Sequence, residues 1–129
     1  MSNFKSFHFD PKSDRVELHN VLDLTGAEVS FNNLPAGVSI PFVHKHTSNE
    51  ELYVVLSGKG VFFVDGEEFE MTEGDCVRVD PNAQRCLKAA DDSPLRYVCI
   101  QTRAQSLQGF TLEDAVVSED FLKPSWLKK

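Results

Sequence analysis

The chain has little cysteine, few basic residues and no long hydrophobic run. Its three cysteines, Cys76, Cys86 and Cys99, are odd in number and form no CxxC pair, so neither a disulfide framework nor a paired-cysteine zinc site is expected. The 13 Lys and Arg against 20 Asp and Glu give a net charge of −7, which argues against nucleic acid and anionic membranes as partners. No apolar run approaches the roughly 20 residues of a membrane-spanning helix, and the first residues lack the apolar segment of a signal peptide. We therefore expect a soluble, cytoplasmic protein with reduced thiols.

The 129 residues, 41% of them hydrophobic, fit one globular domain, 1–129, with a single core. Glycine and proline recur at short intervals and leave pieces that are too short for helices. They predict strands over 4–9, 16–22, 27–34, 40–46, 51–57, 61–64, 67–71, 76–79, 84–89 and 95–102. A single open sheet of so many strands would leave long edges and an uncovered face. We expect an all-β jelly-roll β-barrel whose core spans about 16–103.

Two local signals refine this expectation. Asp65 and Gly66 separate two strand-like segments and suit the positive φ angles of a two-residue hairpin turn. Further along, Thr111 precedes an acidic turn, as the cap of a helix does. We therefore expect a short helix in the C-terminal tail, 110–129.

The most informative residues are His44 and His46. Residues two apart in a strand point to the same side, so we expect both imidazoles on one face of segment 40–46. A carboxylate from the next strand, at Glu50 or Glu51, would complete a site of two histidines and one carboxylate. The alternative is that both histidines are partly exposed and bonded to backbone or water. The glutamate pair, four and five residues after His46, favours the metal site.

The range 37–58 resembles the first motif of the cupin family, which is a glycine, a short spacer, HxH, three or four residues, a glutamate, six residues and a glycine. His46 and Glu51 enclose four residues, and Glu51 and Gly58 enclose six. Glu51 therefore takes the family's ligand position and Glu50 is its alternative. The resemblance implies a small jelly-roll barrel that holds a divalent transition metal, which could be Zn, Fe, Mn, Ni or Cu.

The second motif of the family ends in a further histidine ligand, and this chain has no histidine there. Counting from Gly74 places Arg85 at the ligand position, whereas counting from Pro81 places Cys86 there. An inward Cys86 would offer a thiolate as a possible fourth ligand and favour Zn or Cu. An inward Arg85 would leave three protein ligands and add a planar cation that suits a bound carboxylate, enolate or phosphate. Strand alternation slightly favours Arg85, because it then shares a face with Leu87.

Polar residues on neighbouring strands are expected to bind the ligand, with Tyr53 beside Glu51, and with Tyr97 and Gln101 on the last strand. We expect a small polar or anionic molecule to be held at the metal. An enzyme with this site would be a metal-dependent isomerase, decarboxylase or dioxygenase. The alternatives are a non-catalytic binder or sensor, and a structural cupin that has lost its metal, since a fold does not choose among functions.

A homodimer is also expected. Leu52, Val54 and Leu56 are apolar on the face opposite Glu51 and Tyr53. A strand with apolar residues on both faces needs cover on both, and a symmetric dimer would supply it.

Overall fold

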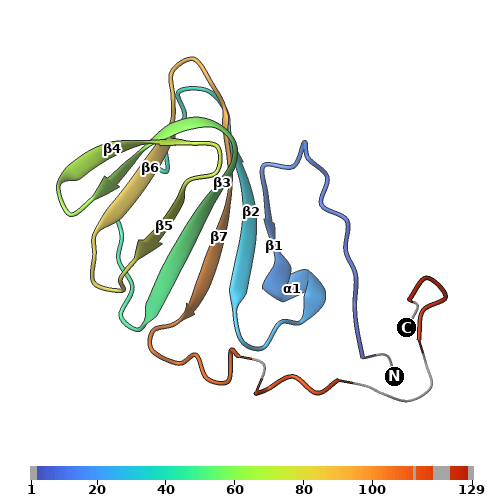
Figure 1. Cartoon of the computed structure of the whole chain (residues 1–129). Coiled ribbons are helices and arrows are strands. Elements are labelled where there is room, and N and C mark those ends of the chain that lie inside the picture. The colour runs from blue at the N-terminus through green and yellow to red at the C-terminus, as the bar shows by residue number, and fades with distance from the viewer. Residues whose placement is uncertain (1–2, 112, 118–122, 128–129) are drawn as a thin grey trace.

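The computed structural model describes residues 3–111, 113–117 and 123–127, and strands dominate this part of the chain (Figure 1). The strands are β1 (Arg15–Glu17), β2 (Glu28–Leu34), β3 (Asn49–Val64), β4 (Glu67–Thr72), β5 (Cys76–Val79), β6 (Arg85–Ala89) and β7 (Leu95–Arg103), and the helix is α1 (Leu18–Leu22). The expectation of a mainly β structure is therefore confirmed.

The long strand β3 belongs to two sheets. Its first half pairs with β7 on one side and β5 on the other, and its second half pairs with β4 and β6. Beyond β7, the first sheet continues to β2 and β1, and Figure 1 shows β3 leading from this sheet into the hairpin with β4. The register shifts between Val55 and Ser57, and such an irregularity lets a strand bend from one sheet into another.

The sheets do not close into a barrel, so the closure expected from the sequence is wrong for the described part of the chain. β1 and β5 are the edges of one sheet, and β4 and β6 are the edges of the other. The segment 35–48, where a strand was expected over 40–46, forms isolated bridges at Ser39 and His44 instead of a strand. Pro35 and Pro41 interrupt this segment, and proline has no N–H to donate to a sheet.

The hairpin between β3 and β4 is confirmed. Val64 pairs with Glu67, which leaves Asp65 and Gly66 as the two turn residues. Their φ angles are 49° and 89°, as a tight turn with two left-handed residues requires.

Two expected strands near the N-terminus are wrong. In the range 16–22, strand β1 ends at Glu17 and helix α1 follows, ending before Asp23, whose φ is 54°. A left-handed residue at this position is a common helix end. Over 4–9 the chain is irregular, although Phe9 stacks on Phe31 with ring centroids 4.6 Å apart.

The C-terminal helix is not found among the described tail residues, which are 110–111, 113–117 and 123–127. Residues 112, 118–122 and 128–129 of the expected helical tail lie outside the described residues. Among the described residues, no helix has the length and hydrophobicity that a membrane crossing needs.

The hydrophobic core lies at one end of the space between the sheets. It includes Val55 and Phe62 of β3, Met71 of β4, Leu87 of β6 and Leu95 of β7. Alternation along these strands directs the residues inward. Both halves of β3 therefore contribute to the core, and the first half also carries Glu51.

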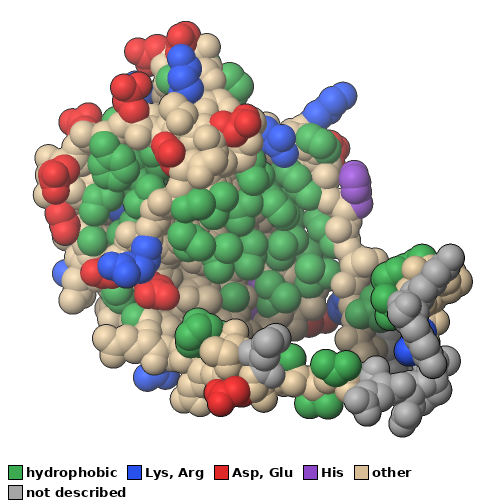
Figure 2. Space-filling view, in the orientation of Figure 1, with side chains coloured by type: hydrophobic (Ala, Val, Ile, Leu, Met, Phe, Trp, Pro, Cys, Tyr) green, Lys and Arg blue, Asp and Glu red, His purple; other side chains and the backbone are tan. Residues whose placement is uncertain are grey.

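The opposite face of the first sheet is also apolar. Leu52 pairs with Ile100 and Val54 with Val98, and both β7 residues also pair with residues of β2. Directly paired residues share one face of a sheet. We call Val29, Phe31, Leu52, Val54, Val98 and Ile100 the outer apolar face. Figure 2 shows hydrophobic side chains gathered over these strands.

Gly58 lies where β3 passes between the sheets, and its replacement by alanine should destabilise the fold strongly. Its φ is 84°, and a Cβ there would lie 1.8 Å from the carbonyl oxygen of Pro94. We expect Gly58→Ala to lower the free energy of unfolding by about 2 kcal/mol or more, measured by urea unfolding with circular dichroism. Gly66→Ala is the matched control, because Gly66 has a similar φ of 89° in open space, and it should cost about 1 kcal/mol. Equal losses in the two variants would contradict this account of Gly58.

Candidate metal centre

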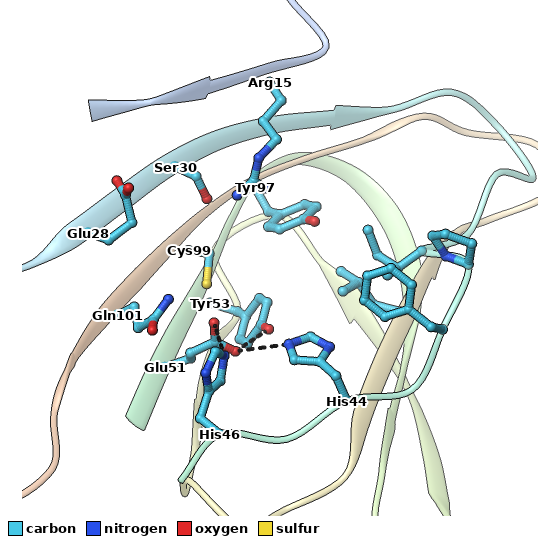
Figure 3. A pocket seen from close by; sticks show the side chains of 14 residues that line it. Arg15, Glu28, Ser30, His44, His46, Glu51, Tyr53, Tyr97, Cys99 and Gln101 are labelled. Carbon is cyan, nitrogen blue, oxygen red and sulfur yellow. Dashed lines mark hydrogen bonds and ion pairs between the residues drawn. The ribbon is translucent and has the colours of Figure 1, made fainter. Parts of the chain in front are cut away.

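A cavity of about 390 Å³ lies between the inner face of the first sheet and the segment 35–48. Its wall includes Ile40, Pro41 and Phe42 of that segment and Leu87 of β6, with polar residues opposite them. Figure 3 shows Arg15, Glu28 and Ser30 at one end of the cavity and His44, His46 and Glu51 at the other. The cavity volume lies within the range of about 300 to 1,000 Å³ that is usual for small-molecule sites.

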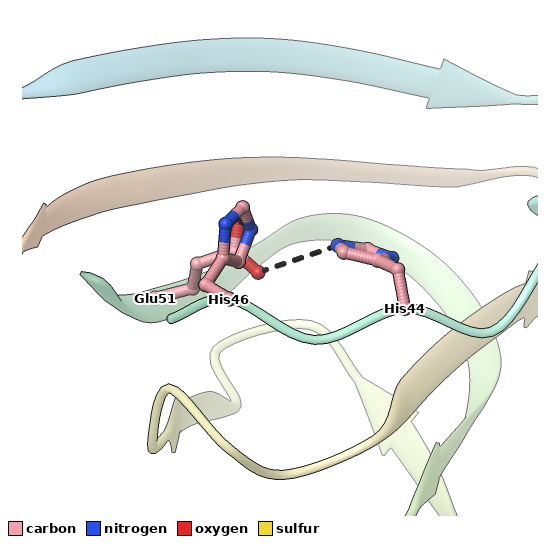
Figure 4. A group of neighbouring side chains, drawn as sticks. All are labelled: His44, His46 and Glu51. Atoms are coloured by element: carbon pink, nitrogen blue, oxygen red, sulfur yellow. Dashed lines mark hydrogen bonds and ion pairs between the residues drawn. The ribbon is translucent and has the colours of Figure 1, made fainter. Parts of the chain in front are cut away.

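His44, His46 and Glu51 converge at one end of this cavity (Figure 4). The Nε2 atom of His46 lies 3.2 Å from Oε2 of Glu51, and Nε2 of His44 lies 4.0 Å from Oε1. The two imidazole rings have centroids 5.2 Å apart. One ligand atom from each of the three residues lies within 4.8 Å of the others.

The histidines reach this position without the regular strand that the sequence predicted. His44 exchanges both backbone hydrogen bonds with Arg85, at 3.1 and 2.9 Å, and the N–H of His46 donates to the carbonyl of Pro81 at 2.8 Å. These bonds fix the segment against β6 and the turn before it. The two imidazoles therefore lie on the same side of the segment although it belongs to neither sheet.

Glu51 is 5% exposed and is held by its neighbour on the same face of β3. The hydroxyl of Tyr53 donates a hydrogen bond of 2.6 Å to Oε1 of Glu51. Burial raises the pKa of Tyr53 far above its usual value, and the negative charge of Glu51 adds to this effect, so the hydroxyl remains a donor. With Oε1 held in this way, Oε2 is the oxygen that faces His46. Glu50 points to the other side of the strand by alternation.

Arg85 and Cys86 are placed on opposite sides of β6. Arg85 points inward and is 0% exposed, with Nη1 3.8 Å from Oε1 of Glu51. It lies next to Glu51 and is not among the residues that line the cavity. Cys86 donates from its Sγ to the carbonyl of Ile40 at 3.3 Å, and the structure does not bring it to the His44, His46 and Glu51 cluster.

Tyr53, Tyr97 and Gln101 all line the cavity, where the sequence predicted ligand-binding residues. The oxygen of the Gln101 side chain accepts a hydrogen bond of 2.7 Å from Asn49. Burial raises the pKa of Tyr97 well above its usual value. It also raises the pKa of the neighbouring Cys99 thiol to about 12, and the charge of Glu51 contributes to this shift. Cys99 is therefore a protonated thiol at neutral pH in the metal-free protein.

Sequence reasoning missed Arg15, Glu28 and Ser30 in the cavity wall. The signal lay in β2, where polar Glu28 and Ser30 alternate with apolar Val29 and Phe31. Such alternation is usually explained by an apolar face turned inward and a polar face turned to water. In this sheet the polar residues face the cavity, so the pattern indicated a polar interior.

His44 has the character of a neutral ligand. Burial lowers its pKa; the charge of Glu51 opposes this effect, whereas Arg85 and His46 reinforce it. An unprotonated imidazole has the free lone pair that metal binding requires. Its buried Nδ1 has no hydrogen-bond partner among the described residues, so the contacts seen there do not fix the tautomer of the ring.

The three donors fit a divalent transition metal. Donors bound to one ion at about 2.0 to 2.2 Å lie roughly 3 to 4 Å from one another. The two histidine nitrogens lie 4.0 and 3.2 Å from the two oxygens of Glu51, and one ligand atom from each residue lies within 4.8 Å of the others, which is close to this spacing. Imidazole and carboxylate ligands suit Zn, Fe, Mn, Ni and Cu. His44, His46 and Glu51 would hold the ion, and such an ion supplies Lewis-acid chemistry or, if it is Fe(II), activation of dioxygen.

Comparison with curated proteins finds similarity over about half of the chain. The sequence is 33% identical over 66 residues to an uncharacterised protein of Methanocaldococcus jannaschii and 28% identical over 67 residues to an oxalate-binding protein of Thermotoga maritima. These matches cover 51% and 52% of the chain. The chain spans about half the length of these relatives, 52% and 54% respectively.

A solved structure aligns over more of the chain than the curated relatives do. The crystal structure of a cupin protein from Bacteroides fragilis is 50% identical, has a TM-score of 0.89 and aligns over 92% of this chain and 99% of that one. A Thermotoga maritima protein described as a predicted oxalate decarboxylase is 25% identical, with a TM-score of 0.53, over 60% of this chain and 64% of that one. Residues 31–101, more than half of the chain, match the cupin domain. The chain therefore belongs to the cupin family.

Proposed function

We propose that this cupin binds a divalent transition metal through His44, His46 and Glu51 and holds a small polar or anionic molecule beside it. The observation that carries the proposal is the convergence of these three donors at one end of a cavity of about 390 Å³. Tyr53, Tyr97 and Gln101 supply polar groups on the cavity wall, and a few placed polar groups orient a ligand in such a site.

The names of two relatives support a small acid as ligand. One is an oxalate-binding protein and the other is described as a predicted oxalate decarboxylase. An enzyme at this site would be an isomerase, a decarboxylase or a dioxygenase, whereas a binder or sensor would leave its ligand unchanged. Incubation of the metal-loaded protein with oxalate separates oxalate decarboxylation from oxalate binding, because decarboxylation releases formate and carbon dioxide and binding alone releases neither. We place this activity in the cytoplasm, where the three free thiols would stay reduced.

Metal analysis of tag-free protein purified without chelator tests the site directly. We expect about one transition metal ion per chain in the parent, and at least a tenfold lower content in the His44→Ala/His46→Ala variant, because two of the three donors are lost. The His8→Ala/His19→Ala variant is the matched control, since both of these histidines are exposed and lie outside the cluster. It should keep its metal.

A folded parent that contains no metal and cannot be loaded with Zn, Fe, Mn, Ni or Cu would contradict the proposal. The chain would then be a cupin without a metal centre. If the parent does contain metal, the identity of the element distinguishes Lewis-acid chemistry from redox chemistry.

We also propose a homodimer formed through the outer apolar face. Four of its six residues, Leu52, Val54, Val98 and Ile100, lie on the two central strands, and most of the face is only half-buried in the single chain. A contiguous apolar patch that stays partly accessible in the single chain is typical of an interaction surface, and a two-fold axis would let the same patch cover itself.

Light scattering at micromolar concentration should give twice the chain mass of 14.5 kDa. Val54→Glu should reduce the measured mass to that of one chain, because it places a charge in the buried contact. Val38→Glu is the control, since Val38 is an exposed hydrophobic residue outside the outer apolar face, and it should leave the dimer intact. If the parent protein has the mass of one chain, the proposed dimer is contradicted.

A further inference from the structure

The guanidinium group of Arg85 is a fixed positive charge beside the metal ligands. It is 0% exposed, and arginine does not lose its proton in proteins. Its Nη2 donates to the carbonyl of Asp80 at 2.6 Å, and its Nη1 lies 3.8 Å from Oε1 of Glu51. Nε and Nη1 have no hydrogen-bond partner among the described residues, and buried polar groups without a partner call for an explanation.

The backbone holds this charge in place relative to the metal ligands. Arg85 and His44 are directly paired through two backbone hydrogen bonds, and paired residues in an antiparallel bridge send their side chains to the same side. Two residues further along β6, Leu87 lines the cavity. Arg85 therefore lies on the inner side of β6, beneath the cluster and screened from the cavity by other groups.

The buried charges beside the His44, His46 and Glu51 cluster are balanced without a metal and unbalanced with one. The buried charged groups there are Glu51 and Arg85, which have opposite signs. Glu28 and Arg15, which also line the cavity, are opposite in sign as well and are less buried. His44, His46 and Glu51 contribute one carboxylate in all. A divalent ion would thus add two positive charges that these residues do not neutralise, and an unbalanced buried charge is costly.

We propose that the metal-loaded centre takes a small anion, a carboxylate or another oxyanion, and that Arg85 is the residue that sets this preference. The inference rests on the proposed function, because it requires the metal at His44, His46 and Glu51. Arg85 acts through its charge and not through contact with the ligand, since it lies next to Glu51 and is not among the residues that line the cavity. Charges interact strongly in a buried site because water screens them weakly there.

This role has a signature that a merely structural role would not produce. A fixed positive charge repels a metal cation and attracts an anionic ligand, so its removal should affect the two affinities in different ways. Loss of the charge should leave metal binding at least as tight and should weaken anion binding. Damage to the fold of the site would weaken both.

The test compares Arg85→Met with Arg85→Lys, which keeps the charge. Each protein is titrated with Co²⁺ by calorimetry, freed of excess metal, and then titrated with formate or with imidazole while the visible spectrum of the bound Co²⁺ is followed. Formate is the anionic probe because its single carboxylate does not readily strip the metal, and imidazole is an uncharged metal ligand. Arg78→Met is the matched control, since Arg78 is an exposed arginine on the neighbouring strand β5.

In Arg85→Met we expect Co²⁺ affinity no weaker than in the parent, formate affinity lower by about tenfold or more, and imidazole affinity within about threefold. Arg85→Lys and Arg78→Met should bind formate within about threefold of the parent. Arg85→Gln serves as a second uncharged variant should Arg85→Met not give the cooperative thermal unfolding of the parent.

Two results would contradict the inference about Arg85 without contradicting the proposed metal site. One is an unchanged preference for formate over imidazole in the uncharged variants, and the other is an equal loss of Co²⁺, formate and imidazole affinity. A parent that binds no Co²⁺ would be a different result, because it overturns the proposed function itself together with this inference.

Discussion

The site depends on the placement of one buried carboxylate, that of Glu51. A carboxylate removed from water must find hydrogen-bond and charge partners inside the protein. Glu51 finds them in Tyr53 of its own strand, in His46 of the preceding segment and in Arg85 of β6. Two parts of the chain that are distant in sequence, residues 44–53 and β6, therefore meet at this carboxylate, and the two imidazoles lie beside it.

The strand that carries Glu51 contributes to both the packing and the candidate site. Its second half supplies Phe62 to the core, between β4 and β6, and its first half supplies Tyr53. The first half also presents Glu51 and Tyr53 to the polar cavity and Leu52 and Val54 to the outer apolar face. The outer face, which usually faces water in such a sheet, is therefore apolar.

The sequence predicted the candidate metal ligands better than it predicted the strand pairing and barrel closure around them. The HxH pair and the glutamate follow from local spacing, and the turn at Asp65 and Gly66 follows from the backbone angles that these residues tolerate. The choice between Arg85 and Cys86 stayed open because a shift of one residue turns a strand side chain to the opposite face. Closure failed because pairing of 40–46 depends on distant partners that local sequence does not specify.

β6 serves as the common support of the centre, and this explains why the site forms without a regular strand at the histidines. Its backbone fixes Ile40 at Leu87 and His44 at Arg85, and the turn before it fixes His46 at Pro81. The same strand sends Arg85 beneath Glu51. The positions of His44, His46 and the buried cation are therefore set by one short strand and the turn before it. A change in the register of β6 would move the imidazoles and the charge together, so geometry and electrostatics are coupled in this fold.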